Sequence, residues 1–278
     1  MLKNISVVFF LGAAAAGVLT THAQTASSAP LPASTAQDIS VDVTPTYASQ
    51  YLFRGQRLGG QSVQVPVEGV DGPWTVGVWA DAPIRDTTRQ SDPEVDYYGT
   101  YAFALGSNFD LKPGLTLYTY PENGLSGAFG RHLGAGEGYY RSTFEPSLAL
   151  DCSVAGLKLN PTYSYDTVLR GSNYELAALY AIPMSGAGTE LDFNGSAGCY
   201  LYSDASRIHD GAALVRSKGD YWTLGASVPF QVVRNVKLTV GWEYEYGDGH
   251  LQQGTARQIA NPQCVGRGVF SASLGYRF

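Results

Sequence analysis

Charged residues are scarce in this chain of 278 residues: they make up 15% of it, and the formal net charge is −6. A nucleic-acid-binding surface needs clustered lysine and arginine, so this balance argues against a nucleic-acid partner. After the N-terminal region, no apolar run is long enough for a membrane-spanning helix. The Cys-x-x-Cys and mixed Cys/His spacings of zinc sites are missing too. Nucleic-acid binders, helical membrane proteins and zinc proteins therefore fit the sequence poorly.

Cysteine is rare as well, with three residues in the whole chain. They are Cys152, Cys199 and Cys264, and each falls in a different segment. Because an odd number of cysteines cannot form a complete disulfide framework in an exported protein, we expect all three to be unpaired. A Cys199–Cys264 bridge is the alternative.

The N-terminus has the order of a secretory signal peptide. Lys3 precedes an apolar run and a small-residue stretch, which predicts a signal peptide at 1–23 with cleavage after Ala23. A single anchoring helix is the alternative, although the Gly/Ala centre is weakly apolar and no basic cluster follows. Residues 24–37 are rich in Ser, Thr, Ala and Pro, which predicts a flexible leader. We expect residues 38–278 to form one outer-membrane barrel domain.

Glycine and tyrosine are abundant instead, at 33 and 19 residues, and the decisive pattern is alternation of apolar and polar side chains. A strand points successive side chains to opposite faces, so a period of two predicts strands and excludes amphipathic helices. In the last segment the apolar face consists of Phe270, Ala272, Leu274, Tyr276 and Phe278. Comparable runs cover 38–54, 62–69, 74–83, 94–105, 114–121, 139–151, 157–168, 174–183, 190–202, 221–232 and 236–246.

Short and long links largely alternate between these runs. Outer-membrane barrels have short turns on the periplasmic side and long loops outside. The sequence therefore predicts an all-β fold, a closed antiparallel up-and-down transmembrane β-barrel of about twelve strands, with both termini in the periplasm. A secreted β-sandwich or jelly roll is the alternative, but its core would favour Leu, Ile and Val over tyrosine. The register stays open at 114–121, because Leu115 and Tyr118 lie on opposite faces.

The polar faces of the predicted strands carry the charged residues. A lysine or arginine pointing at lipid near mid-membrane would cost roughly 2–4 kcal/mol, so these charges belong inside. We expect the lumen to be lined by Asp42, Arg54, Glu68, Asp81, Asp96, Arg141, Glu145, Lys237, Glu243 and Glu245. Acids outnumber bases on these faces, which favours a hydrated lumen that attracts cations. A closed interior in which acids and bases pair is the alternative.

Aromatic residues gather toward the ends of the predicted strands, as expected for rings at the membrane–water boundary. We expect a membrane girdle of Tyr51, Phe53, Trp74, Trp222, Trp242, Tyr244 and Phe278. The chain closes on an alternating strand with Phe278 last. This ending resembles the signal that the barrel-assembly machinery of Gram-negative outer membranes reads, which implies that machinery and outer-membrane lipid as partners.

No catalytic or metal-binding motif is visible. Apart from the predicted signal peptide, the histidines are His132, His209 and His250, and all three fall in predicted long loops. Nucleophile-elbow, phosphate-binding and HExxH motifs are missing from the sequence. An acidic loop at 86–92 has oxygen donors for a divalent cation, but their spacing is unspecific and a solvated loop is the better explanation. We therefore expect no catalytic residues, no metal site, no cofactor and no enzymatic activity.

One group of motifs resembles a known family. The first run contains Tyr51-Leu52-Phe53-Arg54-Gly55, Pro66-Val67 follows, and Gly77-Val78-Trp79-Ala80 lies in the third run. This order is similar to that of the TorF-type family of outer-membrane porins, mainly over 45–105 together with the aromatic C-terminus. Ala80-Asp81 stands where that family usually has Ser-Asn, and the loops at 122–138 and 248–265 do not align. The resemblance implies a porin-like protein and carries over no catalytic residue.

These observations lead to one functional prediction with one alternative. We expect a porin-like channel in the Gram-negative outer membrane for passive diffusion of small solutes, with a preference for cations. The alternative is a non-conducting barrel that binds ligands or partners through its extracellular loops.

Overall fold

The structure is a computed structural model that describes residues 39–84, 93–119, 142–203 and 215–278. The predicted signal peptide and leader lie outside these residues. So does Arg141, one of the predicted lumen residues. The described residues contain no helix long and apolar enough to cross a membrane.

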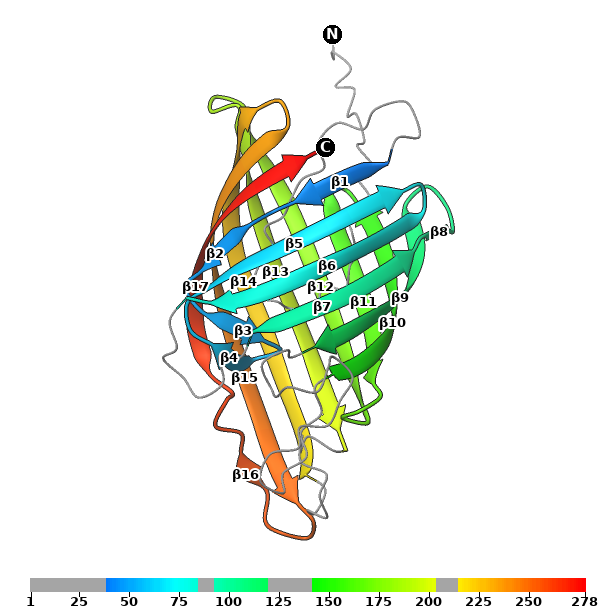
Figure 1. Ribbon diagram of the computed structural model, residues 1–278, viewed down its shortest axis with the longest axis vertical. Coiled ribbons are helices and arrows are strands. Elements are labelled where there is room, and N and C mark those ends of the chain that lie inside the picture. The colour runs from blue at the N-terminus through cyan, green and yellow to red at the C-terminus, as the bar shows by residue number, and fades with distance from the viewer. Residues whose placement is uncertain (1–38, 85–92, 120–141, 204–214) are drawn as a thin grey trace.

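The described strands form one closed antiparallel ring (Figure 1). Its first wall position is shared by β1 (Ser40–Val43) and β2 (Thr46–Ala48). The wall continues through β5 (Ser62–Asp71), β6 (Trp74–Pro83), β7 (Glu94–Tyr101), β9 (Phe109–Thr119), β10 (Ser142–Val154), β11 (Leu157–Asp166), β12 (Gly171–Met184), β13 (Thr189–Tyr202), β14 (Val215–Val233), β15 (Val236–Gln253) and β17 (Gly266–Arg277). Since β1 pairs with both β5 and β17, the ring closes with twelve wall positions in the described chain. The predicted all-β barrel is confirmed.

Two short strands extend the wall without adding to the ring. β8 (Phe103–Ala104) pairs with β9, and β16 (Ile259–Ala260) pairs with the far end of β15. A further pair, β3 (Tyr51–Phe53) and β4 (Gln56–Gly59), makes a separate two-stranded sheet.

Alternation along the wall strands separates an apolar outside from a polar inside. On the outer face large apolar side chains are exposed, among them Val76, Leu115, Leu224, Leu238 and Phe270. On the inner face polar side chains are buried, among them Gln64, Thr75, Thr116, Ser164 and Thr223. A soluble sandwich would show the opposite arrangement, because water would meet the outer face. The wall is built for a lipid surrounding.

The two ends of the barrel differ in their connections. At one end lie the two described termini and the short links between wall strands, such as Gly72–Pro73 and Ala155–Gly156 (Figure 1). Ala155 and Gly156 both have positive φ, 50° and 86°, as a two-residue hairpin turn with matching twist requires. We call this end the turn end. The opposite end, where β14 begins at Val215 and β15 ends at Gln253, is called the loop end.

The wall strands differ from the predicted runs mainly in length. β9 begins at Phe109 instead of 114, and its register is now settled: Leu115 faces outward and Tyr118 is buried inside. β14 and β15 run on to Val215 and Gln253 at the loop end. His250 therefore lies in β15, opposite Lys218, and the prediction that it lies in a loop is wrong. Cross-strand pairing extends these strands beyond their apolar alternation.

The first predicted strand, 38–54, is wrong in its second half. The wall strand ends at Ala48, and the chain then leaves the wall to form the β3–β4 hairpin inside the ring. Tyr51 is only 3% exposed, so neither it nor Phe53 on the same hairpin belongs to a lipid-facing girdle. The alternating pattern continues through this hairpin, because β3 is itself a strand. Alternation alone therefore could not reveal where the wall ended.

Candidate functional site in the barrel interior

The inward hairpin, residues Tyr51–Gly59, turns tightly at Arg54 and Gly55. Both residues have positive φ, 51° and 75°. A two-residue hairpin turn favours glycine or asparagine in such positions, and a long side chain there is uncommon. Arg54 is thus held in a conformation that its own backbone does not favour. The contacts of its side chain explain what holds it there.

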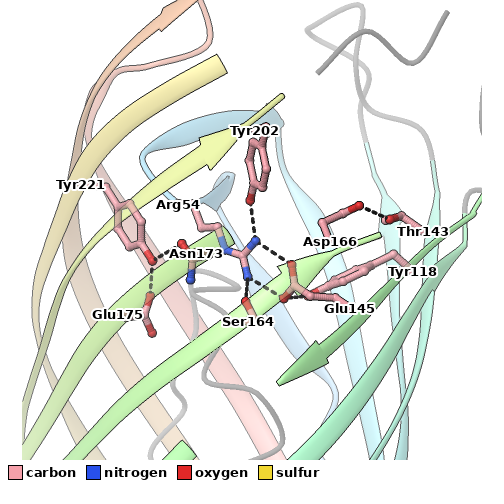
Figure 2. Close-up of polar contacts among 10 residues, drawn as sticks. All are labelled: Arg54, Tyr118, Thr143, Glu145, Ser164, Asp166, Asn173, Glu175, Tyr202 and Tyr221. Atoms are coloured by element: carbon pink, nitrogen blue, oxygen red, sulfur yellow. Dashed lines mark hydrogen bonds and ion pairs between the residues drawn. The ribbon is translucent and has the colours of Figure 1, made fainter. Parts of the chain in front are cut away.

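The Arg54 side chain crosses the interior and binds Glu145 on β10 (Figure 2). Its Nη1 donates to Glu145 Oε2 at 2.9 Å and its Nη2 donates to Glu145 Oε1 at 2.7 Å. Both side chains are almost fully buried, at 3% and 1% exposed. This two-pronged geometry is the strongest pairing that a guanidinium and a carboxylate can make. Such a buried pair is stable only while both partners stay in place.

Three further groups surround the same guanidinium or its carboxylate. Nη1 of Arg54 also donates to the Tyr202 hydroxyl at 2.6 Å, and Nη2 donates to Ser164 Oγ at 3.4 Å. The Tyr118 hydroxyl donates to Glu145 Oε1 at 3.3 Å. These three groups come from β9, β11 and β13, and Glu145 itself lies on β10. We call Tyr118, Glu145, Ser164 and Tyr202 the Glu145 cage.

The flanks of the hairpin are fixed by other wall strands. The Tyr51 hydroxyl donates to Glu94 on β7 at 2.7 Å, and its ring lies 5.6 Å from that of Trp79 on β6. The ring of Phe53 lies 6.3 Å from that of Tyr118. The hairpin thus reaches wall strands on both sides of the interior.

Glycine makes room for the hairpin on β15. A Cβ atom at Gly55 would lie 2.5 Å from the Cα atom of Gly247, and one at Gly247 would collide with the Gly55 carbonyl oxygen. The Gly55 amide donates to a carboxylate oxygen of Glu245. Backbone can approach backbone this closely only where neither residue has a side chain. The wall is therefore shaped to receive the turn of the hairpin.

The segment between β16 and β17 packs against the other side of the hairpin. Arg57 N donates to the Gln263 carbonyl at 2.8 Å, and Val265 N donates to the Gly55 carbonyl at 3.2 Å. Asn261 Nδ2 donates to Gln56 Oε1 at 3.0 Å. The hairpin is consequently bonded along its backbone as well as through its side chains.

Cys264 belongs to this inner segment, and its sulfur lies 3.5 Å from the Tyr200 hydroxyl. Burial raises the pKa of the Cys264 thiol. Cys199 precedes the buried Tyr200 on β13 and so faces the other side of the wall. The Cys199–Cys264 bridge is thereby excluded, and Cys152, Cys199 and Cys264 are all free.

A second polar cluster lies beside the first, as Figure 2 shows. The Tyr221 hydroxyl on β14 contacts Glu175 at 2.7 Å and Asn173 at 3.0 Å, both on β12. Nearby, the amide of Asn194 donates to Glu243. Neutral donors therefore hold both of these carboxyl groups in place.

The turn end pairs its charges along the wall. Arg277 on β17 binds Asp42 on β1, with Nη2 2.6 Å from Oδ2. Lys112 on β9 binds Asp151 on β10. The Tyr98 hydroxyl donates to Glu68 at 2.8 Å. All three contacts join strands that lie next to or near each other in the sheet.

The predicted lumen residues that the structure describes all occupy inward positions. Buried ones are Arg54, Asp81, Asp96, Glu145, Lys237 and Glu245. Partly buried ones are Asp42, Glu68 and Glu243. Their role as the lining of a conducting lumen stays a prediction.

Among the predicted girdle residues, four are exposed on the outer face. They are Trp74, Trp222, Trp242 and Phe278, and Tyr244 beside them is partly exposed. Trp222 packs against the rings of Tyr244 and Tyr246 at 5.6 and 6.0 Å. Their placement at a membrane boundary stays a prediction.

The Glu145 cage contains three residues that the predicted set lacked: Tyr118, Ser164 and Tyr202. The alternation of their strands was a usable signal for their inward direction. It held no signal for their meeting around one guanidinium, because that depends on how the wall curves. The described residues include no group of three or more His, Cys, Asp and Glu side chains arranged to hold a metal.

The closed wall, apolar outside and polar inside, defines an outer-membrane β-barrel protein. Only helices and closed barrels satisfy their backbone groups within a lipid bilayer, and an antiparallel barrel of this kind is the outer-membrane form. The particular family is not shown, since no protein-family model matches the chain and no curated protein matches its sequence.

Solved structures share the fold at low sequence identity. The NanC porin is similar with a TM-score of 0.50 and 11% identity, covering 85% of this chain and 98% of that one. The KdgM porin gives 0.45 and 11%, covering 86% and 99%. The COG4313 outer membrane channel from Pseudomonas putida F1 gives 0.39 and 10%, covering 90% and 98%. At 11% identity, the likeness to the NanC porin shows a common barrel fold.

Proposed function

We propose that this protein is a porin-like channel for passive diffusion of small solutes across the outer membrane. The observation that carries the proposal is the closed wall whose described inner face is predominantly polar. A barrel of about twelve strands lies between filled eight-stranded barrels and open sixteen-stranded porins, so a narrow passage fits its size. The porin fold of NanC, and the Tyr-x-Phe-Arg-Gly resemblance to the TorF-type family, support the same class.

The proposed channel prefers cations. Among the described inward bases, Arg54, Lys112 and Arg277 are each bound to a carboxylate, so their charges are offset locally. Lys237 faces the same interior. Acidic residues outnumber basic ones on the described inner face, and they also include Asp81, Glu94, Asp96, Glu175, Asp192, Glu243 and Glu245. A passage lined by an excess of one charge concentrates ions of the opposite sign.

Conductance in planar bilayers tests the channel, and reversal potential in a KCl gradient tests its selectivity. We expect channel events with a potential that indicates K⁺ preference. Glu175→Gln with Glu243→Gln should move that potential toward zero, because two inward charges are lost. The matched control is Asp220→Asn with Asp248→Asn, a directly opposed outward pair, which should leave the potential unchanged. Anion preference would contradict the acidic-lumen proposal.

The alternative function is a non-conducting barrel that binds ligands or partners through its extracellular loops. The inward hairpin favours it, because Tyr51, Leu52 and Arg54 occupy the interior and bond several wall strands at once. Absence of channel events from correctly folded protein would support this alternative over the channel.

Export and assembly form part of the same proposal. A signal peptide at 1–23 would direct secretion, and β17 would present Phe278 to the barrel-assembly machinery. In support, the Phe278 side chain is 74% exposed at the end of a strand that closes the ring against β1. No catalytic residue is assigned.

A further inference from the structure

The guanidinium of Arg54 is bound by wall residues that lie far from it in the chain. Glu145 lies 91 residues away and Tyr202 lies 148 residues away. We propose that the Glu145 cage is a binding site for solutes that carry a guanidinium group, and that Arg54 occupies it as an internal ligand. This inference rests on the proposed channel for the route by which such a solute arrives.

The cage matches a guanidinium better than other cations. Both terminal nitrogens of Arg54 meet both carboxylate oxygens of Glu145, which a planar fork can do and a single ammonium cannot. Two hydroxyl oxygens, from Tyr202 and Ser164, accept further N–H groups of the same fork. Four acceptor contacts therefore converge on one flat, charged head group. An arginine-like solute would find the same acceptors.

The cage is held by the wall and not by the hairpin. Tyr118, Glu145 and Ser164 stand on β9, β10 and β11, which pair with one another in register. Tyr202 stacks on Tyr200 of its own strand at 5.1 Å and 20°. The Tyr118 hydroxyl also donates to Glu145, so the carboxylate has a contact that comes from the wall and not from Arg54. Removal of the Arg54 side chain would thus leave a buried carboxylate that still requires a cation.

Arg54 competes with any free solute because it is tethered. A short link gives a tethered ligand an effective concentration of order millimolar, so external solute binds weakly until Arg54 withdraws. Arg54 has a positive φ of 51°, which a long side chain rarely adopts, and its contacts in the cage help to offset the cost of that conformation. Wild-type protein should therefore bind guanidinium solutes more weakly than a variant without this side chain.

The direct test is calorimetric titration of purified protein in detergent micelles with methylguanidinium chloride. The first variant is Arg54→Gly, since glycine accepts the positive φ and preserves the turn. We expect Arg54→Gly to bind methylguanidinium more tightly than wild type does. The same variant should bind methylammonium much more weakly than it binds methylguanidinium. Adding Glu145→Gln should weaken the Arg54→Gly affinity by at least about 30-fold, the consequence of losing the buried charge partner.

Two further variants keep the test decisive. Arg54→Lys retains a cation on the hairpin but loses the planar fork of the guanidinium. Methylguanidinium should therefore displace the lysine side chain from the Glu145 cage more easily than it displaces Arg54 in wild type. Arg57→Ala removes an arginine from the same hairpin whose side chain bonds Gln50 at 3.1 Å instead of the cage. It should bind methylguanidinium as weakly as wild type.

Equal binding of methylguanidinium and methylammonium by Arg54→Gly would overturn the inference, as would an affinity unaffected by Glu145→Gln. Titration in micelles does not depend on conductance. A wild-type protein without channel events would therefore refute the proposed channel, while the titration result still decides the cage.

Discussion

The two ends of the barrel interior bury their charges in different ways. At the turn end, Asp42 and Arg277 lie directly opposite each other on neighbouring strands and remain 24% and 27% exposed at their side chains. At the loop end, Arg54 leaves the wall on a hairpin and reaches Glu145, with both side chains at most 3% exposed. The first pair follows from strand register, and the second from closure of the whole ring.

This difference indicates which charge pairs contribute to the stability of the fold. A partly exposed pair between adjacent strands contributes little, because water competes for both partners. A buried pair costs much to form and more to break, since either partner alone is an uncompensated charge. The turn-end pairs therefore add little to a wall whose strand pairing already sets its shape. The Arg54–Glu145 pair, in contrast, fixes the position of the hairpin.

The largest effect should come from Glu145→Gln. If the hairpin stayed in place, the unpaired Arg54 would cost about 3–5 kcal/mol of folding free energy. We expect the hairpin to leave the interior instead, which should raise single-channel conductance several-fold. Trypsin should then cleave after Arg54 or Arg57, and we expect no such cleavage in wild type, where Arg54 is buried. An unchanged tryptic pattern together with unchanged conductance would show that the pair does not hold the hairpin.

A smaller effect is expected from Gly247→Ala, which places a methyl group against the Gly55 carbonyl. Overpacking of this kind typically costs about 1–3 kcal/mol. The cost should appear as partial displacement of the hairpin, seen as a higher mean conductance. The matched control is Gly275→Ala, another inward wall glycine, whose nearest neighbour would be 3.5 Å away in ordinary contact. Equal conductance of the two variants would argue against a close fit between hairpin and wall.

The smallest effect should come from Asp42→Asn at the turn end. Loss of this partly exposed pair should lower the free energy of unfolding by less than about 1 kcal/mol. Urea unfolding of micelle-bound protein measures this change, and the tryptic pattern of the hairpin should match wild type. A loss of unfolding free energy as large as that of Glu145→Gln would show that the two ends do not differ in how much their charge pairs contribute.

The wall could be predicted from the sequence because its physics is local. A lipid-facing strand must alternate, so the inward direction of Glu145, Ser164 and Tyr202 follows from their neighbours in the chain. The twelve wall positions follow from counting such runs. Strand lengths were less predictable, as β14 and β15 continue where cross-strand hydrogen bonds persist after the apolar pattern has ended.

The inward hairpin could not be predicted from the sequence, because alternation is a local signal and it continues through the hairpin. Tyr51 and Phe53 continue the alternation of the first run, so they looked like lipid-facing residues. The chain leaves the wall after Ala48, before these residues, and the turn at Arg54 and Gly55 then folds it back as a hairpin. Neither event changes the alternation.

By itself, the sequence determined which side chains face lipid and which face inward, because that choice is made between adjacent residues. Only the tertiary structure decided which inward groups meet. Arg54 binds Glu145 and Tyr202 because the ring closes and brings distant strands around one hairpin. Which residues the closed ring brings together depends on the whole sheet, and no local pattern records it.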